Sequence, residues 1–239
     1  MTTVKYERPD LLVETEWLED NLDDPNIRIV DCDEFNLFRR AHVKNAIGIP
    51  VHHYIKEKNY SLDARKHPLV APPEVFSDLM CNMGIGNDNL VIAYDNSGSL
   101  YATRFWWVLN YYGHSNVRVL NGGWSKWFDE GRPASIQIPT TERTTFTPKE
   151  NPNLVCSIDY GISQVNDSQS VFLDVRSDEE WNGTNTRGNR RSGHIPGAIH
   201  LEWLNFLDRD NYNIFKPASE LYSVLKEKGV TPERQIITY

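Results

Sequence analysis

Cysteine is scarce in this chain of 239 residues, which contains only Cys32, Cys81 and Cys156. Three widely spaced cysteines exclude a disulfide framework and a zinc knuckle. Long hydrophobic runs are also missing, and without about 18 consecutive apolar residues the sequence offers no membrane span. The N-terminal segment MTTVKYERPDLLVETEW carries charges where a signal peptide needs an apolar stretch. These absences indicate a cytoplasmic globular protein with no membrane partner.

Positive charge is in deficit, because 25 lysines and arginines stand against 33 aspartates and glutamates, a net charge of −8. Nucleic acid is therefore not an expected partner, since phosphate binding needs clustered cations. No metal site is expected either, because the adjacent histidines His52 and His53 lack a third ligand and are weak evidence. At about 150 residues per domain, the length allows one large domain or two modest ones.

The sequence contains an internal repeat, in which three anchors recur in the same order about 145 residues apart. The pairs of anchors are Asp31 and Asp174, His42 and His194, and Tyr94 and Tyr239. The second copy has 9 additional residues between its aspartate and its histidine, around residues 183–189. Three ordered matches indicate a tandem duplication.

Each copy alternates apolar strands with amphipathic helices, which predicts an α/β fold with parallel strands buried on both faces. In the first copy we expect strands over 27–31, 90–94 and 117–120, and helices over 73–83, 101–112 and from 124 onward. In the second we expect helices over 157–165 and 218–228 around a strand that begins at 171. A segment rich in threonine and proline separates the copies. The sequence thus predicts an N-terminal domain over residues 1–135, a linker over 136–153 and a C-terminal domain over 154–239.

The second copy stops at the partner of Tyr94, whereas the first continues for about 40 residues beyond it. A parallel α/β layer that lacks those elements would expose apolar strand faces and be poorly stable alone. We therefore expect the second domain to be incomplete in this chain. Either the natural polypeptide continues beyond Tyr239 or a companion C-terminal fragment completes the domain.

Three motifs resemble those of a known family: LDVRSDEEW followed by GHIPGAIH, the paired AHVKNAIGIP, and YGHSNVRVLNGGWSKW. From about residue 11 to 239 the chain is similar to the tandem-domain rhodanese family, the thiosulfate and 3-mercaptopyruvate sulfurtransferases. The resemblance implies two tandem rhodanese-like domains, the first of them non-catalytic. It also implies transfer of sulfane sulfur from thiosulfate or 3-mercaptopyruvate to a thiophilic acceptor such as cyanide or a thiol, without a cofactor.

The resemblance implies that a cysteine on the loop after the central strand of the second domain holds the sulfur as a persulfide. Such a thiolate is stabilised at a helix start by unpaired N–H groups and the helix dipole. The first copy has Asp95 at this place, which can cap the helix but cannot accept sulfur. The matching place in the second copy directly follows Tyr239. We expect the nucleophilic cysteine there, and we expect the 239-residue chain alone to be inactive.

None of the three cysteines in the chain is expected to replace that nucleophile. Cys32 lies between Asp31 and Asp33, whose charges would raise its pKa. Cys81, within a predicted helix, and Cys156 are both expected to be packing residues.

Three residues are candidates for substrate binding, namely Arg187, Arg191 and His42. Mercaptopyruvate-type relatives have an arginine for the substrate carboxylate at a spacing like that of Arg187, and a guanidinium suits a carboxylate or thiosulfate. A solvated loop arginine is the alternative, and the neighbouring arginines leave the alignment open. The second arginine of that pattern falls near Glu180, a departure typical of thiosulfate-type sequences, so the donor stays open.

His42 is a candidate because mercaptopyruvate-type relatives use a first-domain histidine near the active site, and Asp31 could orient it. A structural role is the alternative. For the whole chain, the alternative function is a non-catalytic rhodanese-like sulfur carrier or protein-binding module, which an aspartate in both loops would favour. Phosphatase chemistry on the same fold would need a longer loop.

Overall fold

The computed structural model describes residues 4–56 and 70–239, with the side chains of His52 and His53 outside the described part. The chain divides into two compact units. The larger unit comprises Arg8–Val155 and Asp210–Ile214, and the smaller comprises Cys156–Arg209, Phe215–Tyr239 and the N-terminal residues up to Glu7. None of the helices in the described residues has the length and apolarity that crossing a membrane requires.

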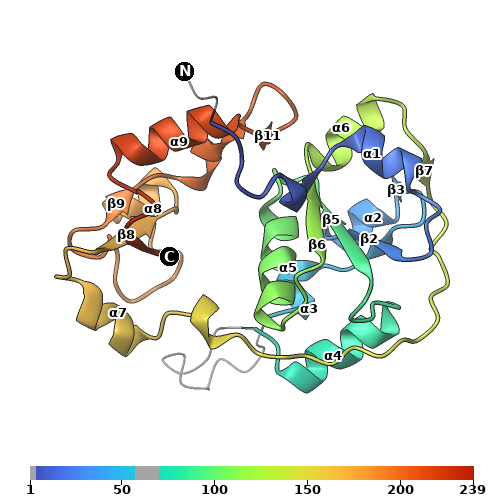
Figure 1. The fold of residues 1–239 in the computed structure, drawn as a ribbon, viewed down its shortest axis with the longest axis horizontal. Coiled ribbons are helices and arrows are strands. Elements are labelled where there is room, and N and C mark those ends of the chain that lie inside the picture. Colours follow the sequence, from blue (N-terminus) through green and yellow to red (C-terminus); the bar gives the residue numbers. More distant parts are fainter. Residues whose placement is uncertain (1–3, 57–69) are drawn as a thin grey trace. The chain divides into compact units, whose positions relative to one another are not determined.

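The larger unit is built on a five-stranded parallel sheet in the order β1-β6-β5-β2-β4 (Figure 1). Its strands are β1 (Leu12–Val13), β2 (Ile27–Asp31), β4 (Ile47–Gly48), β5 (Leu90–Tyr94) and β6 (Val117–Leu120). The three longer strands have the predicted bounds, because each is an apolar run that ends at a polar or turn-forming residue.

Two helical layers cover opposite faces of this sheet (Figure 1). One layer contains α3 (Val51–Tyr54), α4 (Pro73–Asn82) and α5 (Leu100–Tyr111), and the other contains α1 (Thr15–Asp20), α2 (Phe35–Phe38) and α6 (Gly123–Asp129). Along β5, Val91 and Ala93 pack against the first layer, and Ile92 and Tyr94 against the second. Side chains that alternate between two apolar layers explain why the strands contain so few polar residues.

Residues after α6 run along the larger unit. The short strand β7 (Ala134–Ser135) pairs antiparallel with β3 (His42–Val43). Further on, Phe146 is buried in the core, and the N–H of Lys149 donates to the carbonyl of Tyr112 at 2.9 Å. The segment expected to be a linker thus packs against the larger unit. Two single-turn 3-10 helices, η1 (Pro9–Leu11) and η2 (Pro152–Leu154), also belong to this unit.

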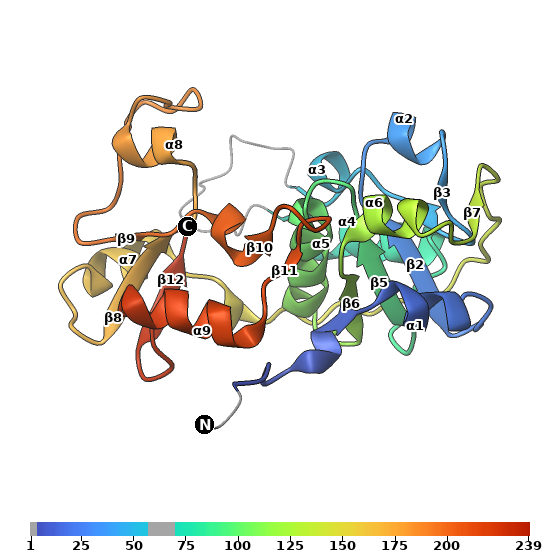
Figure 2. The ribbon, with the colours of Figure 1, turned by 90° about the horizontal axis from the view of Figure 1, so that it is seen from above.

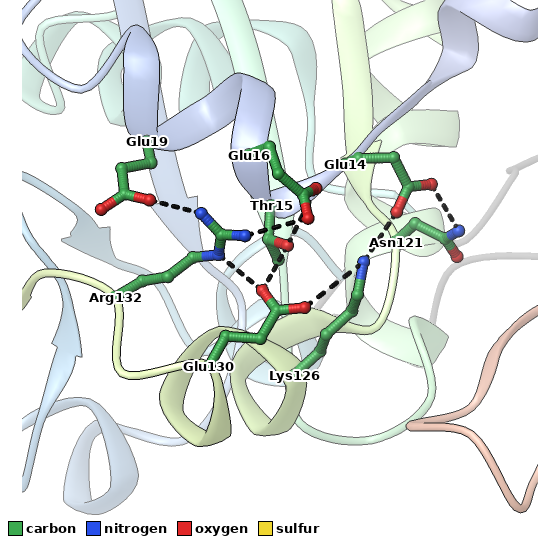
Figure 3. A network of polar contacts seen from close by, with 8 residues as sticks. All are labelled: Glu14, Thr15, Glu16, Glu19, Asn121, Lys126, Glu130 and Arg132. Carbon is green, nitrogen blue, oxygen red and sulfur yellow. Dashed lines mark hydrogen bonds and ion pairs between the residues drawn. The ribbon is translucent and has the colours of Figure 1, made fainter.

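A network of charged and polar side chains connects α1 to the end of α6 (Figure 3). At its centre Arg132 forms ion pairs with Glu16, Glu19 and Glu130. Beside it, Lys126 pairs with Glu14 at 2.8 Å. The network holds the first helix of the unit against its last.

The smaller unit contains a three-stranded parallel sheet in the order β12-β8-β9. Its elements are α7 (Ile158–Gln164), β8 (Ser170–Asp174), α8 (Asp178–Asn182), β9 (Ile199–His200), the 3-10 helix η3 (Trp203–Phe206), α9 (Ala218–Glu227) and β12 (Gln235–Thr238), and Figure 2 shows them turned by 90°. A hairpin of β10 (Leu207–Asp208) and β11 (Ile214–Phe215) precedes α9. The predicted strand and both predicted helices are present, within one residue at each end.

The two sheets repeat one plan, in which β8, β9 and β12 correspond to β2, β4 and β5. At the end of the central strands, the N–H of Cys32 donates to the carbonyl of Tyr94 at 2.8 Å, and that of Val175 donates to the carbonyl of Tyr239 at 3.3 Å. These matched bonds agree with a tandem duplication.

Candidate functional site

The loop between β5 and α5 closes around a carboxylate. Asp95 Oδ1 accepts hydrogen bonds from the N–H groups of Ser97 at 2.7 Å and Ser99 at 2.9 Å. Its Oδ2 accepts from the N–H groups of Tyr101 and Ala102, both at 2.8 Å. The N–H groups in the first turn of a helix have no carbonyl acceptor within the helix, so they form a binding site for an anion. We call these four groups the Asp95 cradle; its occupant is the chain's own side chain, and the predicted capping role of Asp95 is confirmed.

A glycine lets the next loop approach this cradle. A Cβ atom at Gly123 would lie 2.0 Å from the carbonyl oxygen of Asp95, and the φ of Gly123 is +55°. The N–H of Trp124 donates to that same carbonyl at 3.0 Å. The motif VLNGGWSKW therefore has a physical basis, because only glycine fits where the start of α6 meets the loop.

Three carboxylates converge at this end of the sheet. The N–H of Asp33 donates to Asp31 Oδ1 at 3.0 Å, and the N–H of Asn96 donates to Asp33 Oδ2 at 2.8 Å. Burial, followed by the charges of Asp31 and Asp95, raises the pKa of Asp33 to about 7. Burial also raises the pKa values of Asp31 and Asp95, while hydrogen bonds to each oppose the shift. The first copy therefore gathers three acidic groups beside its cradle, and burial disfavours the ionised form of each.

The three cysteines have different surroundings in the structure, two of them buried and one exposed. Burial, then the charges of Asp95, Asp31 and Asp33, raise the pKa of Cys32 well above its ordinary value, which confirms the predicted direction. Cys81 is a core residue, as predicted. The prediction that Cys156 packs internally is wrong, because its side chain is exposed just before α7, a helix that buries none of its residues.

The second copy has the opposite charge at the same place. Asp174 is fully buried, and Arg176 binds it through two contacts, Nε to Oδ1 at 3.0 Å and Nη2 to Oδ2 at 2.5 Å. Burial acts to raise the pKa of Asp174, but the hydrogen bonds and charge of Arg176 outweigh it and lower the pKa overall. Tyr239 Oη accepts a hydrogen bond from the N–H of Ile195 at 2.9 Å, as Tyr94 Oη accepts one from Val43 at 3.0 Å.

The segment that contains the insertion of the second copy, residues 183–193, forms an arginine-rich loop whose two ends are held together. The rings of Trp181 and His194 stack with centroids 3.5 Å apart, and His194 Nδ1 lies 3.0 Å from the carbonyl oxygen of Trp181. His200 stacks on Trp181 as well, with centroids 4.9 Å apart. Arg176 Nη2 donates to the carbonyl of Gly193 at 3.0 Å. We call the stacked pair Trp181 and His194 the loop clasp.

Both candidate arginines lie on this loop with exposed side chains. Arg187 Nη2 lies 3.1 Å from Glu180 Oε2, so the residue that departs from the mercaptopyruvate pattern is the partner of the first candidate. Arg191 forms no ion pair with any residue that the structure describes. The two guanidinium groups share one loop, and one of them is already paired.

The third candidate, His42, belongs to the larger unit and is fully buried. Its Nδ1 lies 2.8 Å from the carbonyl oxygen of Phe38, and its Nε2 lies 3.1 Å from that of Gln137. Carbonyl oxygens only accept hydrogen bonds, so each ring nitrogen can bond to its carbonyl only as a donor. Neither nitrogen is available to a substrate in this arrangement.

The model of the rhodanese-like domain family matches residues 14–130 and 157–239. The chain belongs to the rhodanese family. The predicted pair of tandem rhodanese-like domains is thereby confirmed, as is the predicted fold class of mostly parallel sheets flanked by helices.

Relatives of this rhodanese chain include proteins named for sulfur chemistry. It is 30% identical over 246 residues to the sulfur carrier protein TtuD of Thermus thermophilus, covering 98% of this chain and 83% of the relative. It is 27% identical over 238 residues to thiosulfate sulfurtransferase of Rattus norvegicus, covering 95% and 80%. The crystal structure of the 3-mercaptopyruvate enzyme SseA of Escherichia coli has the same fold, with a TM-score of 0.82, 23% identity and coverage of 95% and 87%.

One functional difference was missed by sequence reasoning. In the repeat, Arg176 has the position that corresponds to Asp33, since each follows its anchor aspartate by two residues. Comparing the two copies position by position would have revealed this reversal of charge. In the structure Arg176 pairs with Asp174.

Proposed function

We propose that this rhodanese chain transfers sulfane sulfur from thiosulfate, or from 3-mercaptopyruvate, to a thiophilic acceptor such as cyanide or a thiol. The sulfur would be held as a persulfide on a cysteine directly after Tyr239. The observation that supports this proposal most is the Asp95 cradle, in which four backbone N–H groups bind an anion at the matching place of the first copy.

The duplication connects the cradle to the second domain. Tyr94 and Tyr239 end their strands with the same backbone and hydroxyl bonds, so the residue that follows each tyrosine has the same place in the plan. In the first copy that residue is Asp95, whose carboxylate fills the cradle. A thiolate or persulfide of similar charge would be stabilised in the same way by a helix start. The proposal therefore assigns the same kind of site to the two copies, with a different anion in each.

The chemistry needs only the cysteine, the donor and the acceptor. The thiolate attacks the outer sulfur of thiosulfate, the sulfur–sulfur bond of the donor breaks, and sulfite leaves with the electron pair. In the second half-reaction the cyanide carbon attacks the terminal sulfur of the persulfide, and the thiolate leaves as thiocyanate forms. The anionic cysteine is present at the start and the end of this cycle, so a cradle that stabilises it serves both steps.

Charge near the second copy supports an anionic donor. Arg187 and Arg191 would bind the oxygens of thiosulfate or the carboxylate of 3-mercaptopyruvate. Because Glu180 already pairs with Arg187, either donor would have to compete with a carboxylate for that guanidinium. We assign His42 a positioning role in the first domain, since its ring is buried between two carbonyl oxygens.

The decisive experiment uses the protein with the residues that follow Tyr239. It is incubated with thiosulfate and cyanide, and thiocyanate is measured. We expect thiocyanate, together with an intact mass one sulfur atom larger that returns to its original value when cyanide is added. Two controls should give no product: a serine variant of the expected cysteine, and a polypeptide that ends at Tyr239. The proposal fails if a folded protein with that cysteine forms no persulfide, or if the position holds another residue.

A second candidate function is sulfur carriage to a protein acceptor. It is favoured by the name of the relative from Thermus thermophilus, a sulfur carrier protein. A carrier would form the persulfide with thiosulfate but release sulfur to cyanide slowly, so the two half-reactions distinguish the candidates. Persulfide formation without turnover would support the carrier, and rapid thiocyanate release would support the enzyme.

A further inference from the structure

A cavity of about 270 Å³ opens in the larger unit beside the Asp95 cradle. Its lining includes Asp31, Asp33, Arg40, Asn96, Trp124 and Phe128. Asp31 ends β2, and Asn96 follows β5 by two residues, so the cavity lies at the carboxyl ends of two neighbouring parallel strands. Open α/β sheets bind ligands in crevices at this edge. The volume is near the lower end of small-molecule pockets, which limits the occupant to a small molecule.

In the part of the chain that the structure describes, no lysine or arginine partners the carboxylates of the cavity, and the basic group whose charge acts on Asp31 is His42. Asp31 and Asp33 are 3% and 4% exposed, and among the described residues no lysine or arginine forms an ion pair with either. Asp33 Oδ2 accepts the N–H of Asn96, and its other oxygen has no hydrogen-bond partner in the described part of the chain. A buried carboxylate without a counter-charge is unfavourable. A ligand that brings an ammonium group to Asp33 would supply that charge and the missing donor.

The remaining walls suit the rest of an organic ligand. The rings of Trp124 and Phe128 have centroids 5.4 Å apart, and Phe128 is 56% exposed although it is a large apolar side chain. Arg40 is exposed and forms no ion pair with a described residue. An aromatic wall packs against an apolar group, and a guanidinium without a partner binds a carboxylate through two hydrogen bonds.

The second copy argues against an anionic sulfur donor in this cavity. There Arg176 occupies the position of Asp33 and neutralises the anchor aspartate, whereas in the first copy two buried carboxyl groups have no lysine or arginine partner among the described residues. We propose that the cavity beside the Asp95 cradle binds a small molecule with both an ammonium group and a carboxylate, the class of free amino acids. The ammonium group contacts Asp33, the carboxylate contacts Arg40, and the side chain lies against Trp124 and Phe128. This site is independent of sulfur transfer by the second domain.

Calorimetry on the 239-residue chain tests the proposal with L-phenylalanine and L-methionine as probes. Two analogues of phenylalanine separate its charges: 2-phenylethylamine lacks the carboxylate, and 3-phenylpropionate lacks the ammonium group. We expect at least one amino acid to bind, and to bind at least tenfold more tightly than the corresponding single-charge compound. In NMR spectra, the signals of the Asn96 N–H and the Trp124 indole N–H should shift during the titration.

Two variants assign the contacts, and a third serves as the control. Asp33→Asn retains an oxygen for the Asn96 N–H, and it should weaken amino-acid binding at least tenfold. Arg40→Ala should weaken the amino acid but leave the affinity for 2-phenylethylamine unchanged. Lys44→Ala, on an exposed pair with Asp23 outside the cavity, should change neither affinity. The proposal is overturned if no amino acid binds the folded chain at millimolar concentration, if 2-phenylethylamine binds as tightly as phenylalanine, or if Asp33→Asn has no effect.

Discussion

The two copies of the duplicated plan share the hydrogen bonds at the end of the central strand but differ in the charge that surrounds it. In each copy a tyrosine hydroxyl accepts a backbone N–H and also contacts the anchor aspartate. Two residues beyond that aspartate, the first copy has Asp33 and the second has Arg176. Burial raises the pKa of Asp31, whereas at Asp174 the hydrogen bonds and charge of Arg176 outweigh burial and the pKa is lowered.

This difference teaches that the backbone arrangement and the chemistry of the site are separable. Hydrogen bonds between main-chain groups and one tyrosine position the strand ends, and they do not require a particular charge nearby. A single change of side chain then selects whether the edge favours a cation or an anion. The first domain can therefore retain the fold of the family while its loop is filled by Asp95.

The two copies also differ in how much of their helices they bury. In the larger unit, α4 and α5 each contribute at least three buried residues to the core. In the smaller unit, α7 and α9 contribute no buried residue, and Ile162 is 67% exposed. Both helices nevertheless form within one residue of the predicted bounds. Their local signals, such as the Ser157 cap that accepts the N–H of Tyr160, suffice to place the helices without a deep core.

The largest effect is expected when the Asp95 cradle loses its occupant. Asp95→Ala would leave four N–H groups without a partner, which should lower the free energy of unfolding by about 3 kcal/mol. Urea unfolding followed by circular dichroism measures the change, with Asp88→Ala on an exposed loop residue as the control. Added sulfate should restore part of the stability of the Ala variant, because an anion can enter the cradle. Equal stability of the two variants would show that the N–H groups do not depend on the carboxylate.

A matched pair of substitutions should act in opposite directions on the two copies. Asp33 has a pKa of about 7 in the folded protein and about 4 when unfolded. Its contribution to stability is present at low pH and lost as the pH rises through 7, so Asp33→Asn should stabilise the larger unit at pH 8 by about 1 kcal/mol. The pKa of Asp174 is lowered, so its contribution is present above pH 4 and lost as the pH falls further. Asp174→Asn should therefore destabilise the smaller unit at pH 8, by about 1–2 kcal/mol.

Hydrogen exchange of the amides in β5 and β12 reads the two units separately at pH 8 and pH 5. Asp33→Asn and Asp174→Asn each replace one carboxylate oxygen with an amide nitrogen near the end of a central strand, so each serves as the control for the other. The benefit of Asp33→Asn should shrink at pH 5, where the wild-type carboxyl is mostly protonated. Destabilisation by both substitutions at pH 8 would contradict the charge difference between the copies.

Much of this fold can be predicted from the sequence because its signals are local. Strands β2, β5 and β6 are apolar runs with clear ends, and the repeat identifies the partners of β2 and β5 in the second copy. The short elements α2 and α8, and the pairing of β3 with β7, were not predicted. Each of these helices and strands contains at most five residues, which is too short to show a periodic pattern of apolar residues.

The site was harder to predict because its character depends on side chains from distant segments. The cradle followed from the place of Asp95 in the repeat, but the convergence of Asp31, Asp33 and Asp95 requires strands 63 residues apart to be paired. The ion pair of Arg187 with Glu180 also depends on how the insertion folds back on α8. Sequence motifs identify the candidate substrate-binding residues. Which of these side chains already form ion pairs or hydrogen bonds within the protein depends on how the loops pack.

The loop clasp has a counterpart in the first copy, where the rings of Phe38 and His42 stack with centroids 4.0 Å apart, but only the clasp closes an arginine-rich loop, so opening it should affect the second copy alone. Trp181→Ala removes an aromatic stack worth about 0.5–1.5 kcal/mol, which should raise the population of the open loop by up to roughly tenfold. Limited trypsin digestion measures this directly, because Arg187, Arg190 and Arg191 are cleavage sites. We expect faster cutting at these arginines and an unchanged rate in the larger unit. Tyr222→Ala, an exposed aromatic of α9, is the control, and equal cleavage of both variants would contradict the clasp.

The smallest effect is expected for the charged network of the larger unit, which joins surface side chains (Figure 3). Arg132→Ala removes three ion pairs at once, but its glutamate partners are partly exposed to solvent, so the loss should be about 1 kcal/mol or less. Lys44→Ala removes the single exposed pair with Asp23 and should cost less still. Urea unfolding at low salt and at 0.5 M NaCl, about the range where screening becomes strong, compares the two. The difference in free energy of unfolding between the two variants should shrink at high salt, because salt screens ion pairs at the surface. A loss of stability in Arg132→Ala that does not depend on salt would instead assign the effect to the packing of Arg132 on Trp127.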